Sequence, residues 1–264
     1  MTSAKTPEIA LSVIMPSLNE EDNVGRAIAN SLEAFDEFSI SGEVVCVNDG
    51  STDGTARIAE EWQKRDPRVK VVTHAKPMGI GASFWDGVDH AQGWSVVMLP
   101  GDNENDPAEI FRYHHLMDSV DVVIPFVFNK QVRSLFRNGL SFAYRFIINT
   151  SFLVYFNYTN GTVIYRRAAL EGLEFRSSGF FFQTDILIRL VKRGYLFAEV
   201  PYRLDLRKDG VSKAVSFPSL VQVTRGYLRL VRDVYLDSDA RQNTYTGDSV
   251  THKRRLSVRR GGKS

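Results

Sequence analysis

The sequence predicts an α/β protein built on a doubly wound, mostly parallel sheet with helices on both faces. The main observation is a pattern of apolar run, polar loop and helical segment that occurs four times in about 110 residues, as in consecutive βα units. The second is composition, because 264 residues with 43% hydrophobic and 24% charged side chains can bury one sizeable core. The net charge of +2 is too small to indicate a nucleic-acid partner.

The four units follow one another along the first half of the chain. In the first, the β-rich run 9–15 ends at Pro16, and a segment with capping residues, early acids and helical spacing follows. In the second, Cys46 lies in a predicted buried strand, and a single cysteine allows neither a disulfide framework nor a cysteine metal site, which fits a reducing compartment. The units are IALSVIMPSLNEEDNVGRAIANSLEAF, GEVVCVNDGSTDGTARIAEEWQKR, RVKVVTHAKPMGIGASFWDGVDHA and WSVVMLPGDNENDPAEIFRYHHLM.

The pattern changes after "DVVIPFVF". Residues 133–156 mix aromatic, aliphatic and cationic side chains over a helical length, which fits either a helix buried against the sheet or an amphipathic helix at a lipid interface. The segment "TNGTVIYRRAAL" then indicates a turn, a strand and a helix start, and "GFFFQTDILIRLVKRGYLFAEVPYRLDL" a loop, a helix and a strand. We therefore expect this half to add strands to the same sheet, within one domain over 1–236.

The C-terminal segment 237–264 is polar, then basic, and its first part has no periodicity. We expect a disordered tail here, either a solvated end or a segment that binds an anionic membrane surface. The N-terminus has no apolar signal segment and no window reaches about 18 apolar residues, so we expect no secretory signal and no transmembrane helix. These features predict a cytoplasmic protein, soluble or peripheral to the membrane. The tail cations are Lys253, Arg254, Arg255, Arg259, Arg260 and Lys263.

The loops after the four strands are rich in acids, amides and glycines. In a parallel sheet these loops share the carboxyl edge, where ligands bind. Taken alone, the acids of "LPGDNENDP" (99–107) are consistent with solvated turn formers, but their place at this edge favours a binding role. Gly50 and Gly54 allow the second loop to turn tightly. Side chains suited to the base and ribose of a nucleotide-sugar are Asn19, Glu20, Asp22, Asn48 and Asp49.

Several other site types lack their signatures. The chain has no G-x-G-x-x-G after the first strand, no P-loop motif and no G-x-S-x-G, which argues against dinucleotide, P-loop and serine-hydrolase sites. "GIG" at 79–81 is only a weak glycine motif. The histidines lack metal-site spacing, and we interpret them as surface residues or as hydrogen-bonded core residues: His74, His90, His114, His115 and His252.

These motifs together resemble family 2 glycosyltransferases with the GT-A fold. The resemblance rests on "SVIMPSLNEEDNV", "VVCVNDGSTDGT", "KPMGIGAS" with "GVDHAQG", and "VVMLPGDNENDP". The later "TNGTVIYRRAAL", "FFFQTDILIRLVKRGYLFAEVP" and "RKDGVSK" resemble the polyprenyl-phosphate branch, typified by dolichyl-phosphate mannose synthases, so that the match spans about residues 9–215 in order. The nucleotide-binding residues that the resemblance implies are Pro16, Leu18, Glu20, Asn48, Asp49, Lys76, Gly81, Gly101 and Asp102.

The resemblance also implies a metal site in the fourth loop. The family usually has the motif D-x-D in this loop, and a Gln often follows it two residues later. When the two sequences are aligned on the shared Pro107, Pro100 takes the place of the first Asp, Asp102 that of the second Asp, and Glu104 that of the Gln. The two carboxylates are then expected to hold Mg²⁺ or Mn²⁺ against the donor diphosphate. Asp106 is interpreted as a turn or helix-cap residue. The missing first Asp leaves room for weaker metal binding or for lost turnover.

Two further positions carry over from the resemblance. Asp185 occupies the acidic position that many inverting relatives use as a base, or it is simply an acid in the first turn of a helix. "RKDGVSK" either closes over phosphates or is a charged surface turn. Together with Asp102, the expected catalytic residues are Asp185, Arg207 and Lys213, and the expected acceptor-phosphate residues are Arg133, Arg137, Arg207, Ser212 and Lys213.

The expected function is therefore an inverting, metal-dependent transfer of a sugar from a UDP- or GDP-sugar to a polyprenyl phosphate at the inner membrane face. One alternative is a family 2 transferase that acts on a hydroxyl of a soluble or glycan acceptor, with Asp185 as base. Another is a noncatalytic nucleotide-sugar-binding protein, which Pro100 and Gly101 make plausible.

Overall fold

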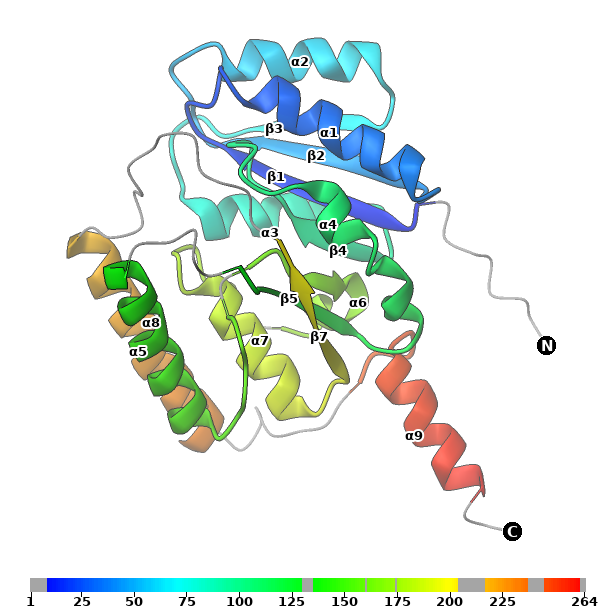
Figure 1. Cartoon of the computed structure of the whole chain (residues 1–264), viewed down its shortest axis with the longest axis vertical. Coiled ribbons are helices and arrows are strands. Elements are labelled where there is room, and N and C mark those ends of the chain that lie inside the picture. The colour runs from blue at the N-terminus through cyan, green and yellow to red at the C-terminus, as the bar shows by residue number, and fades with distance from the viewer. Residues whose placement is uncertain are drawn as a thin grey trace.

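The chain folds around a single seven-stranded sheet (Figure 1). The computed structural model describes residues 9–129, 135–159, 161–173, 175–203, 217–236 and 245–261. The strand order is β3-β2-β1-β4-β6-β5-β7, and every neighbouring pair is parallel except those of β6, which runs antiparallel to β4 and β5. The strands are β1 (Leu11–Ser17), β2 (Gly42–Asn48), β3 (Val69–Thr73), β4 (Ser95–Met98), β5 (Val122–Val127), β6 (Ile164–Arg166) and β7 (Phe197–Tyr202). The predicted mostly parallel sheet is confirmed.

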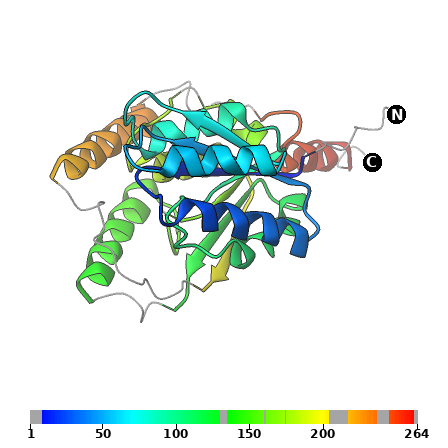
Figure 2. The ribbon, with the colours of Figure 1, turned by 90° about the horizontal axis from the view of Figure 1, so that it is seen from above.

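Helices cover both faces of this sheet, as the sequence predicted (Figures 1 and 2). One apolar core contains side chains of α1, α2 and α4, and the other contains side chains of α3 and α5–α8. The helices are α1 (Val24–Glu37), α2 (Thr55–Arg65), α3 (Ile80–His90), α4 (Pro107–Phe111), α5 (Leu135–Phe152), α6 (Arg167–Glu171), α7 (Phe182–Arg193), α8 (Phe217–Leu236) and α9 (Val250–Gly261), with a short 3₁₀ helix at His114–Asp118.

The buried strand β1 shows how one apolar run serves both cores. Successive side chains of a strand point to opposite faces, so Val13 packs in the core of α1, and Ile14 in the core of α3. Gly87 of α3 lets that helix approach closely, because a Cβ there would lie 2.3 Å from Cγ2 of Ile14. This packing fixes where α3 begins, and α3 begins at the carboxyl edge of the sheet.

Helix α5 combines the two alternatives that the sequence left open for 133–156. Its inner side chains Ile148 and Phe152 are buried in the second core. On its outer side Phe142 and Phe146 are each 61% exposed and stack with ring centroids 6.4 Å apart. The amphipathic helix is therefore confirmed, and its contact with lipid stays a prediction. In the described part of the chain no helix is both long and apolar enough to cross a membrane.

The expectation of a disordered C-terminal tail is wrong for residues 245–261. Residues 250–261 form helix α9, and Thr251 at its start is 2% exposed. The cause is the buried Asp121, which lies just before β5 and accepts hydrogen bonds from the backbone N–H groups of Val250 (2.8 Å) and Thr251 (2.9 Å). The first turn of a helix has unpaired N–H donors, so a carboxylate there orders it. The remaining residues of 237–264 lie outside the described part.

Candidate functional site

The loops that follow β1 and β2 are joined at the carboxyl edge by side-chain hydrogen bonds. The Asn19 side-chain oxygen accepts from the backbone N–H of Thr52 at 2.9 Å, and the Glu21 carboxylate accepts from Gly54 N–H at 2.8 Å. Glu20 is an expected nucleotide ligand; its backbone N–H donates to the Thr55 hydroxyl oxygen at 2.8 Å, and its side chain is partly exposed. The shared edge predicted for these loops is therefore present, and Asn19 serves to hold it together.

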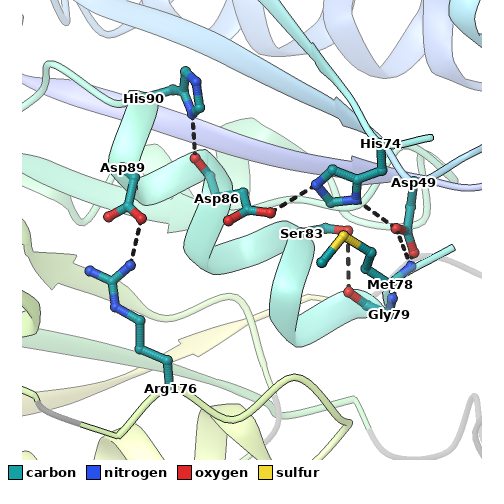
Figure 3. A network of polar contacts seen from close by, with 9 residues as sticks. All are labelled: Asp49, His74, Met78, Gly79, Ser83, Asp86, Asp89, His90 and Arg176. Atoms are coloured by element: carbon teal, nitrogen blue, oxygen red, sulfur yellow. Dashed lines mark hydrogen bonds and ion pairs between the residues drawn. The ribbon is translucent and has the colours of Figure 1, made fainter. Parts of the chain in front are cut away.

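A second contact joins the loops after β2 and β3 through Asp49 (Figure 3). Its carboxylate accepts hydrogen bonds from the backbone N–H of Met78 (2.7 Å) and Gly79 (2.9 Å) and lies 2.8 Å from Nδ1 of His74. Burial works to raise the pKa of Asp49, but these hydrogen bonds outweigh it and the pKa is lowered. Asp49, expected to bind the nucleotide, thus carries a full negative charge and also shapes the next loop.

The other expected nucleotide residues of these two loops differ in exposure. Asn48 is 2% exposed and its side-chain oxygen accepts from Ser51 N–H at 3.1 Å, so it supports the turn. Lys76 is exposed at the rim. Gly50 has φ +71°, and a Cβ there would lie 2.6 Å from the carbonyl carbon of Lys76, so only glycine fits where the two loops touch.

Gly81 lies where α3 meets the segment before α7. Its N–H donates to the carbonyl of Ser178 at 2.9 Å, and a Cβ would lie 2.4 Å from the carbonyl oxygen of Ser177. The glycine therefore permits close backbone contact between two segments about a hundred residues apart in the chain. The third loop is thus held on both sides, because Met78 and Gly79 just before α3 donate to Asp49, and Gly81 in the first turn of α3 donates to Ser178.

The fourth loop packs against the end of β1. Gly101 N–H donates to the carbonyl of Pro16 at 3.0 Å, and a Cβ there would lie 2.2 Å from Oγ of Ser17. Leu18 follows β1 at this point and is half-buried. The loop of the acidic motif is thereby anchored beside the first two loops.

Asp102 and Glu104 are both half-buried in this loop. Oδ1 of Asp102 accepts from Glu104 N–H at 3.1 Å, so the loop turns locally around the two acids. Asp106 is confirmed as a cap, because its side chain accepts from Ala108 N–H at the start of α4. No cluster of three or more histidine, cysteine, aspartate or glutamate side chains is arranged for a metal within the residues described. Two carboxylates fit Mg²⁺ or Mn²⁺ when substrate phosphates complete the ligand set.

Asp185 lies inside an ion-pair network rather than alone at the edge. It is 2% exposed and pairs with Arg189 through both oxygens, Nε to Oδ2 at 2.8 Å and Nη2 to Oδ1 at 3.2 Å. Arg189 also donates to Asp233 of α8 at 2.8 Å. Burial raises the pKa of Asp185 although Arg189 opposes this. The network links α7 to α8, a role that sequence reasoning missed because Asp233 lies 48 positions from Asp185.

The remaining expected residues cannot be placed beside this edge. Arg133, Arg207, Ser212 and Lys213 lie outside the described residues, as does the side chain of Arg137.

The mostly parallel seven-stranded sheet with helices on both faces is the GT-A glycosyltransferase fold, and residues 12–174 match "Glycosyl transferase family 2". The chain therefore belongs to glycosyltransferase family 2 and is a glycosyltransferase. It is 31% identical over 220 residues to the polyprenol monophosphomannose synthase of Mycolicibacterium smegmatis, covering 76% of this chain and 79% of that protein.

Solved structures agree on the fold. Glucosyl-3-phosphoglycerate synthase of M. tuberculosis superimposes with a TM-score of 0.64 at 20% identity, over 84% of this chain and 81% of that one. A crystal structure of the same enzyme in complex with Mn²⁺, UDP and phosphoglyceric acid gives a TM-score of 0.60 at 19% identity, over 86% and 78%.

Proposed function

We propose that this protein is an inverting, metal-dependent glycosyltransferase that moves a sugar from a UDP- or GDP-sugar to a polyprenyl phosphate. The observation that carries the proposal is its similarity to polyprenol monophosphomannose synthase along most of both chains. The joined loops after β1–β4 support a donor site at the carboxyl edge.

The donor would lie against the first four loops. Pro16, Leu18 and Glu20 would line the nucleotide from the first loop, and Asn48, Asp49, Lys76 and Gly81 from the next two. Asp49 and Glu20 would offer acceptors to base or ribose groups, and the exposed Lys76 would lie near the diphosphate. Gly101 lets Asp102 approach the diphosphate closely.

Asp102 and Glu104 would hold Mg²⁺ or Mn²⁺, which supplies charge neutralisation at the departing nucleoside diphosphate. A phosphate oxygen of the acceptor attacks the anomeric carbon in line. The new bond joins that carbon to the acceptor oxygen, while the bond to the diphosphate oxygen breaks and its electron pair leaves with the nucleoside diphosphate. The configuration inverts because attack and departure are on opposite faces.

The acceptor phosphate would be held by four cations and one hydroxyl from the second half of the chain: Arg133, Arg137, Arg207, Lys213 and Ser212. Guanidinium and ammonium groups bind phosphate through charge-assisted hydrogen bonds. Because a phosphate anion needs no deprotonation, this acceptor is compatible with an Asp185 that is occupied by Arg189.

The isoprenoid tail of the acceptor stays in the bilayer, so the enzyme must work at the surface of the membrane. We propose a peripheral position at the cytoplasmic face, with the exposed aromatic side of α5 entering the interface. Phe142, Phe146 and Ile147 would lie among the headgroups, as amphipathic helices do.

The test is transfer from radiolabelled UDP- and GDP-sugars to a short-chain polyprenyl phosphate in the presence of Mg²⁺ or Mn²⁺. An organic-extractable, acid-labile product is expected, and the matching polyprenol without phosphate should accept nothing. Label on a soluble or glycan hydroxyl instead would favour the other transferase activity. Nucleotide binding without transfer to any acceptor would favour a binding protein.

A further inference from the structure

His74 lies between two carboxylates that come from different elements (Figure 3). Its Nδ1 is 2.8 Å from Oδ1 of Asp49, which follows β2, and its Nε2 is 2.9 Å from Oδ2 of Asp86 in α3. The imidazole is nearly buried, at 9% exposed. Both ring nitrogens therefore face oxygen atoms that can only accept while the carboxylates are ionised.

This arrangement suits one charge state of the ring. A neutral imidazole carries a single N–H and can donate to only one of the two carboxylates, leaving a lone pair against the other. The imidazolium has two N–H groups and donates to both. The bridge between Asp49 and Asp86 is therefore complete only when His74 is protonated.

The bridge controls the shape of the donor edge. Asp49 also accepts the N–H groups of Met78 and Gly79, the residues that lead into α3. His74 thereby joins the end of β2, the loop 74–79 and the first half of α3 through one side chain. Loss of the hydrogen bond to Asp86 would remove the link from α3 to this loop that passes through His74, whereas Ser83 Oγ still donates to the carbonyl of Gly79 at 3.2 Å.

The neighbouring charged groups are occupied elsewhere. Nδ1–H of His90 donates to the backbone carbonyl of Asp86 at 2.7 Å and not to its carboxylate. Asp89 pairs with Arg176, whose guanidinium lies 4.8 Å above the ring of Trp85. Among the contacts of the described residues, the charged groups that face His74 are thus Asp49 and Asp86.

We infer that His74 is a positioning residue of the donor site, and that its protonation sets how tightly the nucleotide binds. The inference rests on the proposed function, because it takes the edge formed by Asp49 and its loop as the nucleotide site. Affinity is high while the imidazolium holds both carboxylates. It falls once the ring loses one proton, because a neutral imidazole donates to only one of the two carboxylates.

Three variants separate this role from simple structural support. His74→Gln cannot carry the positive charge that joins both carboxylates, so its affinity should be low and flat with pH. Asp86→Asn suits a neutral imidazole, because Nδ1–H still donates to Asp49 while Nε2 accepts from the new amide; its affinity should be high and flat. His90→Gln is the matched control, since His90 is on the same helix but does not bridge carboxylates, and it should follow the wild type.

The experiment is calorimetric titration of each full-length protein with UDP and with GDP, in Mn²⁺, from pH 6 to 9. The wild-type Kd should rise by about tenfold across this range, the size expected for losing one hydrogen bond to a charged group. Titration of the nucleotide itself is common to all four proteins and cancels in the comparison. Long-range ¹⁵N NMR of the free wild type should show N–H at both ring nitrogens of His74 at pH 6.

Other outcomes would overturn the inference. A wild-type profile no steeper than that of Asp86→Asn, or a His74→Gln protein that matches the wild type throughout, removes the role of His74 and leaves the transferase proposal standing. A neutral His74 ring at pH 6 does the same. If the wild type binds neither nucleotide at any pH, the donor site and the inference both fail. If the His74→Gln protein does not fold, the comparison of the pH profile of Asp86→Asn with that of the wild type tests the inference.

Discussion

At the scale of single residues, Asp102 and Glu104 are the two acids that we propose as metal ligands. They occupy a loop that Gly101 anchors to Pro16, so their backbone is held beside the loop after β1. Asp106, two positions further, accepts from Ala108 N–H and stabilises the start of α4. Of the three acids in this loop, Asp106 is thus a cap residue, whereas the metal role of the other two is a proposal.

We predict that Asp102→Asn lowers kcat by at least about 10²-fold and raises the Mn²⁺ concentration needed for half-maximal rate, because a metal ligand contributes several kcal/mol at the leaving group. Glu104→Gln should weaken metal binding in the same direction. Asp106→Asn is the control: it alters a cap and leaves the metal titration unchanged. Full activity in excess chelator, or unchanged metal titrations in both variants, would refute the assignment.

A second residue-scale prediction concerns Asp185. If the acceptor is an anion, Asp185→Asn and Asp233→Asn should behave alike, because each removes one carboxylate from Arg189 and leaves the other. Each should cost about 1–3 kcal/mol of the free energy of unfolding and change kcat by less than about tenfold. The measurements are urea unfolding and initial rates on the phosphate acceptor. A kcat loss of about 10²–10⁴-fold confined to Asp185→Asn would instead indicate a general base and a hydroxyl acceptor.

At the scale of elements, α9 shows how a helix late in the chain is held against the sheet by one buried side chain. Asp121 also pairs with Arg166 of β6 at 2.9 Å, so one buried carboxylate holds a strand and a helix start. Tyr245, just before α9, packs its ring against Tyr195 with centroids 5.2 Å apart. These contacts lie at the amino end of β5, at the edge of the sheet opposite the candidate site.

We predict that Thr251→Val lowers the free energy of unfolding by about 1 kcal/mol, because its hydroxyl donates to the buried Asp121. Asp121→Asn should cost more, about 3–5 kcal/mol, since it leaves the Arg166 guanidinium without its buried partner. Urea unfolding measures both changes. Ser257→Ala, on the exposed part of α9, should have little effect. Equal stability of all three variants would show that α9 is not fastened by this contact.

At the scale of the whole molecule, two features that could meet a membrane lie on opposite sides. Helix α5 lies at one side of the sheet together with α8, whereas α9 projects from the other side (Figures 1 and 2). Ser151 of α5 and Tyr227 of α8 share a hydrogen bond of 2.7 Å, which ties the two helices together. The cations of α9 at Lys253, Arg254 and Arg259 are exposed. Apolar and electrostatic contacts can therefore be separated by mutation.

We predict binding to anionic vesicles that weakens with salt, with about 1 kcal/mol contributed per cation near the surface. Arg254→Ser with Arg259→Ser should weaken binding at low salt, and Phe142→Ser with Phe146→Ser should weaken it also at high salt, where apolar contact remains. Vesicle co-sedimentation measures this, and these substitutions leave the Asp121 contact intact, unlike removal of 250–264. Full-length protein that ignores anionic vesicles at low salt would argue for a soluble acceptor.

Much of the fold could be predicted because it depends on local patterns. Apolar runs followed by capped amphipathic segments recur in the first four units, and a parallel strand buried on both faces needs little else to be recognised. The common edge of the four loops follows from that topology. The cap role of Asp106 could likewise be predicted from the sequence, because its hydrogen-bond partner Ala108 is two residues away.

The partners of buried charges depended on the tertiary structure. From the sequence, His74 was interpreted as a surface residue or a hydrogen-bonded core residue. Only the tertiary structure shows that it lies between Asp49 and Asp86. The same holds for Asp185 with Arg189 and Asp233. The C-terminal segment was predicted to be disordered because the partner that fixes the start of α9, Asp121, lies about 130 positions earlier in the chain.

The sequence by itself determined the family, the order of the strands and helices in the first four units, and the loops that meet at one edge, because these follow from periodicity and from motifs within a few residues. Tertiary structure alone decided that β6 runs antiparallel, that α9 is ordered, and which carboxylates are occupied by cations. The physical reason is that a buried charge must find a partner, and the nearest one in space can lie anywhere along the chain.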